Sequence, residues 1–128
     1  MSVLLEVENV TMRFGGLVAV DDISFALDEG KVLAVIGPNG AGKSTLFNVI
    51  TGVYKPTAGR VKFDGVDVTG MPSYEVVQLG IARTFQSSRL FSDLSVLDNV
   101  IIGMHTRTKA SVLDVLFRPG VARREMEA

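Results

Sequence analysis

Hydrophobic and polar residues alternate along two segments near the start of the chain. Residues 4–12 and residues 20–27 each place apolar side chains at every second position among polar ones. Alternation with a period of two is typical of strands that bury one face. The second segment runs into residues 28–30, Asp-Glu-Gly, which is a turn sequence. The pattern therefore predicts an early pair of strands.

A continuous apolar run comes next. Residues 31–36 read K-V-L-A-V-I, which predicts a short buried strand. Residues 43–51 instead carry Leu46, Val49 and Ile50 at helical spacing. We therefore expect a strand, a glycine-rich turn and a helix in succession.

Turn signals divide the middle of the chain. Residues 52–59 hold glycine, proline and threonine and predict a loop, and residues 59–68 predict two strands that turn at Asp64-Gly65. Pro72 predicts the first turn of a helix that runs through Leu79 and stops at Gly80.

The later part of the chain is mostly helical in pattern. Residues 81–85 predict a short strand, and Ser95 and Asp98 form a capping box that starts a helix. Its apolar face would consist of Val96, Leu97, Val100, Ile101 and Met104. Residues 110–117 form a second amphipathic stretch, and a last helical pattern opens at Val121. Because that helix has barely begun at Ala128, we expect this chain to be the N-terminal part of a longer protein.

The turn between the predicted strand and helix contains a ligand-binding sequence pattern. Its sequence fits the phosphate-binding pattern G-x-x-x-x-G-K-[ST] and reads Gly37-Pro38-Asn39-Gly40-Ala41-Gly42-Lys43-Ser44-Thr45. A strand before this pattern and a helix after it are the context that distinguishes a P-loop from a chance match. We therefore predict a nucleotide-binding loop at residues 37–45.

Each residue type in this loop suits a nucleotide triphosphate. Small residues let backbone N–H groups converge on phosphate oxygens, and Gly40 and Gly42 permit a positive φ. The following helix presents its N-terminus to the same anion. Lys43 supplies a positive charge to the β- and γ-phosphates, Ser44 can ligate Mg²⁺, and the hydroxyl of Thr45 can reach an α-phosphate oxygen. The expected cofactors are ATP and Mg²⁺.

Composition sets only broad limits. The 128 residues include 13 basic and 14 acidic ones, giving a net charge of −1, so no overall field favours nucleic acid or an anionic membrane. The absence of cysteine excludes a disulfide framework and fits a reducing compartment. The first ten residues lack the basic start of a signal peptide, and no stretch is apolar for long enough to span a bilayer.

The order of motifs resembles the ATP-binding subunit of ABC transporters, and the resemblance is strongest to the ATPases of branched-chain amino-acid importers. It runs to about Met104 and weakens after that. The strings that carry it are G-P-N-G-A-G-K-S-T, T-G-x-x-x-P-T-x-G-x-V at residues 51–61, R-F-G-G-L at 13–17, G-I-A-R-T-F-Q at 80–86 and L-F-S-D-L-S-V-L-D-N at 90–99.

The resemblance implies roles for two residues outside the P-loop. Phe14 matches the aromatic residue that stacks on adenine, and a ring face can stack on any nucleobase. Gln86 matches the glutamine of the Q-loop, which contacts Mg²⁺ or the nearby water and borders the membrane subunit. With Lys43 as the catalytic candidate, Ser44 and Gln86 are then the expected metal ligands.

The family resemblance also implies a fold: an α/β P-loop NTPase core with an N-terminal antiparallel β part. Residues 1–88 would form the N-terminal part of that core, with the Q-loop near residue 86, and residues 89–128 the start of the α-helical subdomain. The signature Leu-Ser-Gly-Gly-Gln, a Walker B strand after the P-loop and the switch histidine are all missing from the sequence. We therefore expect this chain to bind nucleotide without turnover.

Three features of the sequence resemble catalytic or ligand-binding residues, but each has a simpler structural explanation. Asp28-Glu29 looks like the end of a Walker B strand but precedes the P-loop and suits a turn better. His105 follows Lys43 too closely to be a switch histidine, and a solvated helix end suits it. The arginines after residue 117 are interleaved with glutamates, as on a solvated helix face.

The resemblance further implies partners and a location. These are membrane-spanning permease subunits, a second ABC ATPase subunit and, indirectly, a solute-binding protein, with the chain at the cytoplasmic face of the inner membrane and no nucleic acid bound. Alternatives are a urea- or lipopolysaccharide-type ABC ATPase, or a soluble ABC protein of DNA repair or translation. The strand pair ahead of the P-loop argues against an unrelated P-loop kinase or GTPase.

Overall fold

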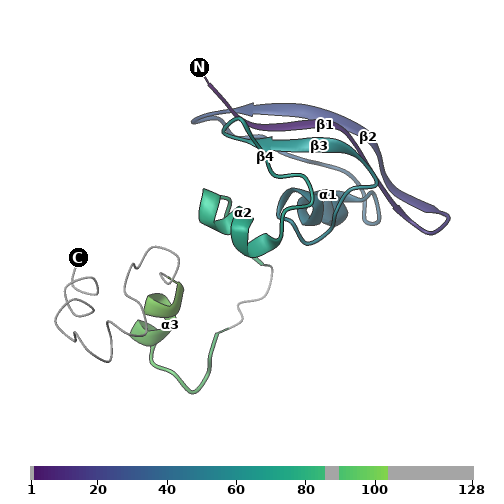
Figure 1. The fold of residues 1–128 in the computed structure, drawn as a ribbon. Coiled ribbons are helices and arrows are strands. Elements are labelled where there is room, and N and C mark those ends of the chain that lie inside the picture. The colour runs from purple at the N-terminus through teal and green to yellow at the C-terminus, as the bar shows by residue number, and fades with distance from the viewer. Residues whose placement is uncertain (1, 86–89, 104–128) are drawn as a thin grey trace. The chain divides into compact units, whose positions relative to one another are not determined.

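The computed structural model describes residues 2–85 and 90–103. The chain separates into two compact units, Met1–Arg83 and Thr84–Ala128. The first unit contains four strands and two helices, and the described part of the second contains one helix (Figure 1). In chain order the elements are β1 Val3–Phe14, β2 Leu17–Asp28, α1 Lys43–Ile50, β3 Ala58–Phe63, β4 Val66–Asp67, α2 Ser73–Leu79 and α3 Val96–Gly103.

The four strands form one antiparallel sheet in the order β2-β1-β3-β4. The predicted strand pair at the start of the chain is therefore confirmed, and both strands are longer than their alternating segments. The predicted turn at Asp64-Gly65 is confirmed as well, because Phe63 pairs with Val66 and both turn residues have positive φ. Two positive φ values match the two-residue hairpin turn that follows the twist of the strands.

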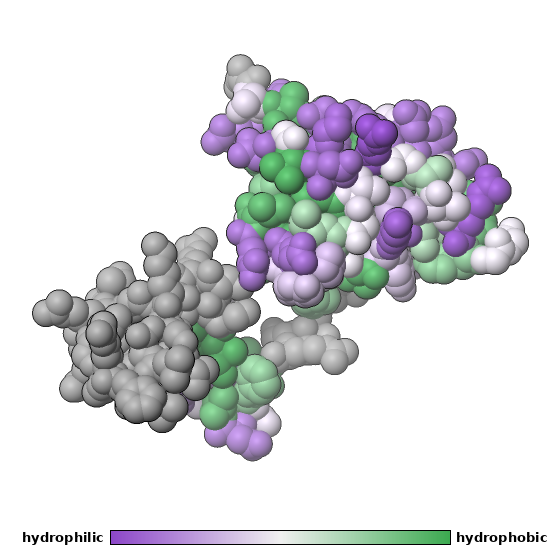
Figure 2. Space-filling view, viewed as in Figure 1, coloured by the Kyte–Doolittle hydropathy of each residue, from purple (hydrophilic) through white to green (hydrophobic). Residues whose placement is uncertain are grey.

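Helices α1 and α2 lie against the same face of the sheet (Figure 1). The buried core of the first unit joins the sheet to these two helices and consists of Val7, Val10, Met12, Val20, Leu46, Val49, Ile50, Val61, Val68 and Val76. The three apolar positions predicted for α1 are all in this list. Figure 2 shows hydrophilic residues along the top of this unit, over the sheet.

Residues 31–36 do not form the buried strand that the apolar run predicts. They belong to no strand of the sheet, and Val32 and Ile36 are 98% and 91% exposed. A strand of this composition is stable when parallel neighbours satisfy its backbone and cover both faces. Among residues 2–85 and 90–103, no strand pairs with this segment.

The short strand predicted at residues 81–85 is also wrong. That segment follows α2 without pairing to the described sheet, although Ile81 packs against the core. It is nevertheless attached, because the Arg83 guanidinium donates a hydrogen bond from Nη1 to Oδ1 of Asn48 on α1. Helix α2 begins after Pro72 and ends at Gly80, which has a φ of 116°.

In the second unit, the capping box before α3 is confirmed. The Asp98 amide donates to Ser95 Oγ at 3.1 Å, and the Ser95 hydroxyl donates to the Asp98 carboxylate at 2.6 Å. The predicted apolar face is not buried: Val96, Leu97 and Val100 are exposed. Figure 2 shows hydrophobic residues of this unit at the surface. Met104, His105, the amphipathic stretch at 110–117 and the later helical pattern lie outside the described residues.

Candidate nucleotide-binding site

The predicted phosphate loop connects the extended segment at 31–36 to the start of α1. The Ala41 amide donates to the Pro38 carbonyl at 3.2 Å, which closes a tight turn around Asn39 and Gly40. Gly40 and Gly42 adopt φ values of 84° and 88°. This is the left-handed region where glycine is favoured, and it is the conformation that the sequence predicted for both positions.

Strand β2 fixes the position of Gly42. A Cβ atom added at Gly42 would lie only 2.1 Å from the carbonyl oxygen of Ala19 on β2. The two backbones therefore approach so closely that only glycine fits. This contact places the phosphate loop directly against the N-terminal sheet.

The N-terminus of α1 is open to an anion. The first intrahelical bond runs from the Leu46 amide to the Gly42 carbonyl at 2.9 Å, so the amides of Lys43, Ser44 and Thr45 precede the helical ladder. No side chain caps this helix, and its first turn carries no acidic residue. Free amides and the positive end of the helix dipole together attract phosphate oxygens.

Lys43 folds back over the loop that precedes it. Its Nζ donates to the carbonyl oxygens of Gly37 and Pro38 at 2.5 and 2.6 Å. The ammonium group is therefore held against the backbone of the loop that leads into α1. The positive charge of Lys43 therefore lies beside the loop that is expected to bind the β- and γ-phosphates of a nucleotide.

Phe14 is the last residue of β1 and is 43% exposed. Its ring meets the ring of Tyr54 edge to face, with centroids 5.3 Å apart and an interplanar angle of 78°. An exposed aromatic face in this part of the structure could stack on a base. No sequence pattern indicates Tyr54, because a residue in the loop after α1 meets Phe14 only in the folded chain.

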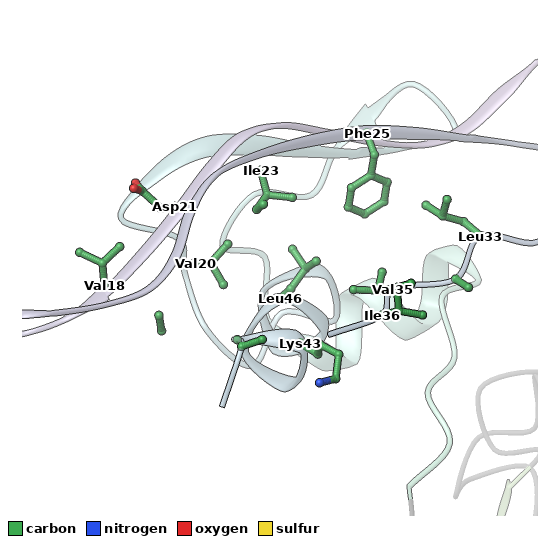
Figure 3. A pocket seen from close by; sticks show the side chains of 14 residues that line it. Val18, Val20, Asp21, Ile23, Phe25, Leu33, Val35, Ile36, Lys43 and Leu46 are labelled. Atoms are coloured by element: carbon green, nitrogen blue, oxygen red, sulfur yellow. The ribbon is translucent and has the colours of Figure 1, made fainter. Parts of the chain in front are cut away.

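A cavity of about 600 Å³ lies between β2 and residues 33–36 and reaches the start of α1 (Figure 3). Its lining is mostly apolar and includes Val18, Val20, Ile23, Phe25, Leu33 and Leu46, with Lys43 at one side. Phe14, Ser44 and Thr45 are not part of this lining. The cavity therefore suits apolar side chains better than a nucleotide.

The expected metal site is incomplete in the part of the chain that is described. Ser44 lies at the start of α1 with its side chain exposed, while Gln86 lies outside the described residues. Among residues 2–85 and 90–103, no three His, Asp or Glu side chains gather as metal ligands do. Of the two expected Mg²⁺ ligands, the structure therefore describes only Ser44.

The described residues with shifted pKa values lie away from the loop. The Glu8 carboxylate, 2.7 Å from Lys62 Nζ, accepts its hydrogen bond and raises the pKa of Lys62. Hydrogen bonds from Thr69 lower the pKa of Asp67. The first pair joins β1 to β3, and the second lies at the end of β4 and just after it. Asp28 and Glu29, which look like the end of a Walker B strand, begin a turn as predicted. The Lys31 amide donates to the Asp28 carbonyl at 3.1 Å.

Comparisons with known proteins show which family the sequence matches. A model of the ABC transporter family matches residues 20–127. The chain is 42% identical over 126 residues to the high-affinity branched-chain amino acid transport ATP-binding protein BraF of Pseudomonas aeruginosa, covering 98% of this chain and 49% of that protein. It is 39% identical, with the same coverage, to LivG of Escherichia coli. The ribose import ATP-binding protein RbsA 2 of Rhizobium johnstonii is 38% identical over 111 residues, which cover 87% of this chain and 22% of that protein.

Solved structures show the same fold. A nucleotide-free ATP-binding cassette of an ABC transporter superposes with a TM-score of 0.77 at 35% identity, covering 98% of this chain and 51% of that one. The ADP conformation of the MJ1267 cassette gives 0.76 at 41% identity, covering 91% and 46%. The chain belongs to the ABC transporter family and has the fold of part of its ATP-binding cassette. It spans about half the length of the curated branched-chain relatives it matches.

Proposed function

We propose that this chain is the nucleotide-binding part of an ABC-type ATPase that drives import of a small solute. The observation that carries the proposal is the phosphate loop. Two glycines with positive φ precede the N-terminus of α1, which no side chain caps. Two carbonyl groups of the loop accept hydrogen bonds from the Lys43 ammonium group. This combination attracts and orients a triphosphate through backbone dipoles and the positive charge of Lys43.

The proposed roles follow from these positions. The amides at the start of α1 and the Lys43 ammonium hold the β- and γ-phosphates, and the Phe14 ring stacks on the base. The Ser44 hydroxyl and the Gln86 side chain are the proposed ligands of Mg²⁺, which would neutralise charge on the phosphates. Each of these groups binds or orients the nucleotide.

Turnover is proposed only for the longer protein. Phosphoryl transfer to water needs a carboxylate that orients the attacking water, and ABC ATPases place further groups at the γ-phosphate from a partner subunit. The sequence of residues 1–128 has no Walker B carboxylate after the P-loop and no signature motif. The 128-residue chain by itself would then bind ATP and not hydrolyse it.

The proposed solute is a branched-chain, hydrophobic amino acid. The support is that BraF and LivG, which match 98% of this chain, are branched-chain amino acid transport ATP-binding proteins. Ribose is a second candidate, because a ribose import protein is 38% identical. Uptake of labelled leucine and labelled ribose by cells with and without the gene would separate the two solutes.

The proposed assembly has the usual parts of such an importer. Membrane-spanning permease subunits and a second ATPase subunit would bind the longer protein, and a solute-binding protein would act through the permease. The proposed location is the cytoplasmic face of the inner membrane, as a peripheral subunit. Among the described residues, no helix has the length and apolar character of a membrane span.

The test of nucleotide binding is the substitution Lys43→Ala. Loss of one charge-assisted contact to phosphate costs about 1–3 kcal/mol, which is a roughly 5- to 150-fold weaker affinity for ATP. Isothermal titration with Mg²⁺-ATP measures the change, and Lys31→Ala, an exposed lysine ahead of the loop, is the matched control. Equal ATP affinity in all three proteins would contradict the proposal.

A further inference from the structure

The exposed ring of Phe14 packs against the ring of Tyr54. The two rings contact edge to face, at 5.3 Å between centroids and 78° between planes. Both residues are partly exposed, at 43% for Phe14 and 36% for Tyr54. An edge-to-face contact engages one side of an aromatic pair and leaves ring surface open to a further planar partner.

The backbone of Tyr54 is anchored to the phosphate-binding helix. The amides of Val53 and Tyr54 both donate to the carbonyl oxygen of Asn48 on α1, at 2.8 and 3.1 Å. Asn48 lies five positions after Lys43 on the same eight-residue helix. The backbone of Tyr54 is therefore tied to α1.

The same loop is anchored to the end of β1. The Thr57 amide donates to the Thr11 carbonyl at 2.9 Å, and the Arg13 amide donates to Thr57 Oγ1 at 3.0 Å. Arg13 directly precedes Phe14. The loop at residues 52–57 therefore joins the phosphate-binding helix to the strand end that carries the aromatic ring.

We propose that Tyr54 is a positioning residue for the nucleobase: it holds the Phe14 ring for stacking and, through the loop at residues 52–57, sets its spacing from the phosphate loop. This inference rests on the proposed function, since it assigns the base end of the same nucleotide. The ligand is a nucleoside triphosphate of any base, because stacking on a ring face does not distinguish bases.

The experiment separates the base end of the ligand from its phosphate end. ATP engages both, whereas inorganic tripolyphosphate has no base and engages only the phosphate loop. Affinities for both ligands are measured by isothermal titration on the 128-residue chain and its variants. Tyr54→Leu removes the ring, Tyr54→Phe keeps it, and Tyr74→Leu is the control at the other tyrosine, which is exposed on α2.

We expect Tyr54→Leu to weaken ATP by about three- to tenfold, the range of an aromatic pair, and to leave tripolyphosphate within about twofold. Tyr54→Phe should restore the affinity for ATP, and Tyr74→Leu should change neither ligand. In a Phe14→Leu background, Tyr54→Leu should cause no further loss, because its effect passes through the Phe14 ring.

Two results would overturn the inference: an equal loss for ATP and tripolyphosphate in Tyr54→Leu, or no loss for ATP. The first would mean that Tyr54 only supports the fold of the loop. Lys43→Ala distinguishes a failure of the proposed function, because it should weaken both ligands. If Lys43→Ala weakens the binding of neither ATP nor tripolyphosphate, the proposed phosphate site is contradicted, independently of the result for Tyr54.

Tyrosine fluorescence gives an independent readout. The chain has no tryptophan and only two tyrosines, so in a Tyr74→Phe variant the emission comes from Tyr54 alone. A base stacked beside Tyr54 should change that emission when ATP is added and not when tripolyphosphate is added. Identical changes with both ligands would contradict the placement of the base.

Discussion

Replacing Gly42 with alanine puts a methyl group where β2 already lies. The new Cβ would be 2.1 Å from the Ala19 carbonyl oxygen, and the residue would keep a φ of 88°. The left-handed conformation costs a non-glycine residue roughly 1–2 kcal/mol. Relief of the clash by backbone movement adds about 1–3 kcal/mol. We therefore expect Gly42→Ala to lower the free energy of unfolding by about 2–5 kcal/mol, a large part of the roughly 5–15 kcal/mol of an ordinary domain.

Two further substitutions separate the clash from the conformational strain. Gly40 has a φ of 84° but open space around its Cβ position, so Gly40→Ala should cost only the strain, about 1–2 kcal/mol. Gly16 has open space and no positive φ, so Gly16→Ala should stay within about 0.5 kcal/mol. Urea denaturation of the three variants gives the free energies, and titration with tripolyphosphate reports the loop. If Gly42→Ala costs no more than Gly40→Ala, the contact with Ala19 does not constrain the loop.

Two further predictions concern the Asn48–Arg83 bond and turnover. Asn48→Leu leaves the half-buried Arg83 guanidinium without one of its acceptors and should cost about 1–3 kcal/mol in urea denaturation, whereas Asn48→Asp keeps an acceptor oxygen and should cost less. Equal losses in the two variants would show that the bond contributes little. The 128-residue chain should release no phosphate from ATP above the level of Lys43→Ala, and a Lys43-dependent rate would contradict the role proposed for the missing carboxylate.

The site was predictable wherever its conformation is set by neighbouring residues. Gly40 in its tight turn and Gly42 at the helix start both adopt the positive φ that glycine favours, and the helix after them follows from apolar residues at helical spacing. The turn at Asp64-Gly65 and the Ser95 capping box are equally local, and both are present in the structure. The family could be recognised for the same reason, because its motifs are short strings of adjacent residues.

Two predicted strands failed because a strand depends on partners that are distant in the sequence. The apolar composition of residues 31–36 fits a buried parallel strand, but a strand exists only when neighbouring backbones accept and donate its hydrogen bonds. No strand in the described sheet pairs with this segment or with residues 81–85. The domain bounds 1–88 and 89–128 stay predictions, and so do the ligand-binding roles of Phe14, Lys43, Ser44 and Gln86.

By itself, then, the sequence determined the phosphate loop, its helix, the hairpins and the family, because each is encoded in a few consecutive side chains and backbone conformations. Only the tertiary structure decided what these elements touch. It placed Ala19 against Gly42, folded Lys43 onto the Gly37 and Pro38 carbonyls, and brought Tyr54 to Phe14. Contacts between residues far apart in the sequence, such as Phe14 and Tyr54, depend on how the sheet and helices pack. That packing is fixed by the shared burial of apolar faces, which no local pattern specifies.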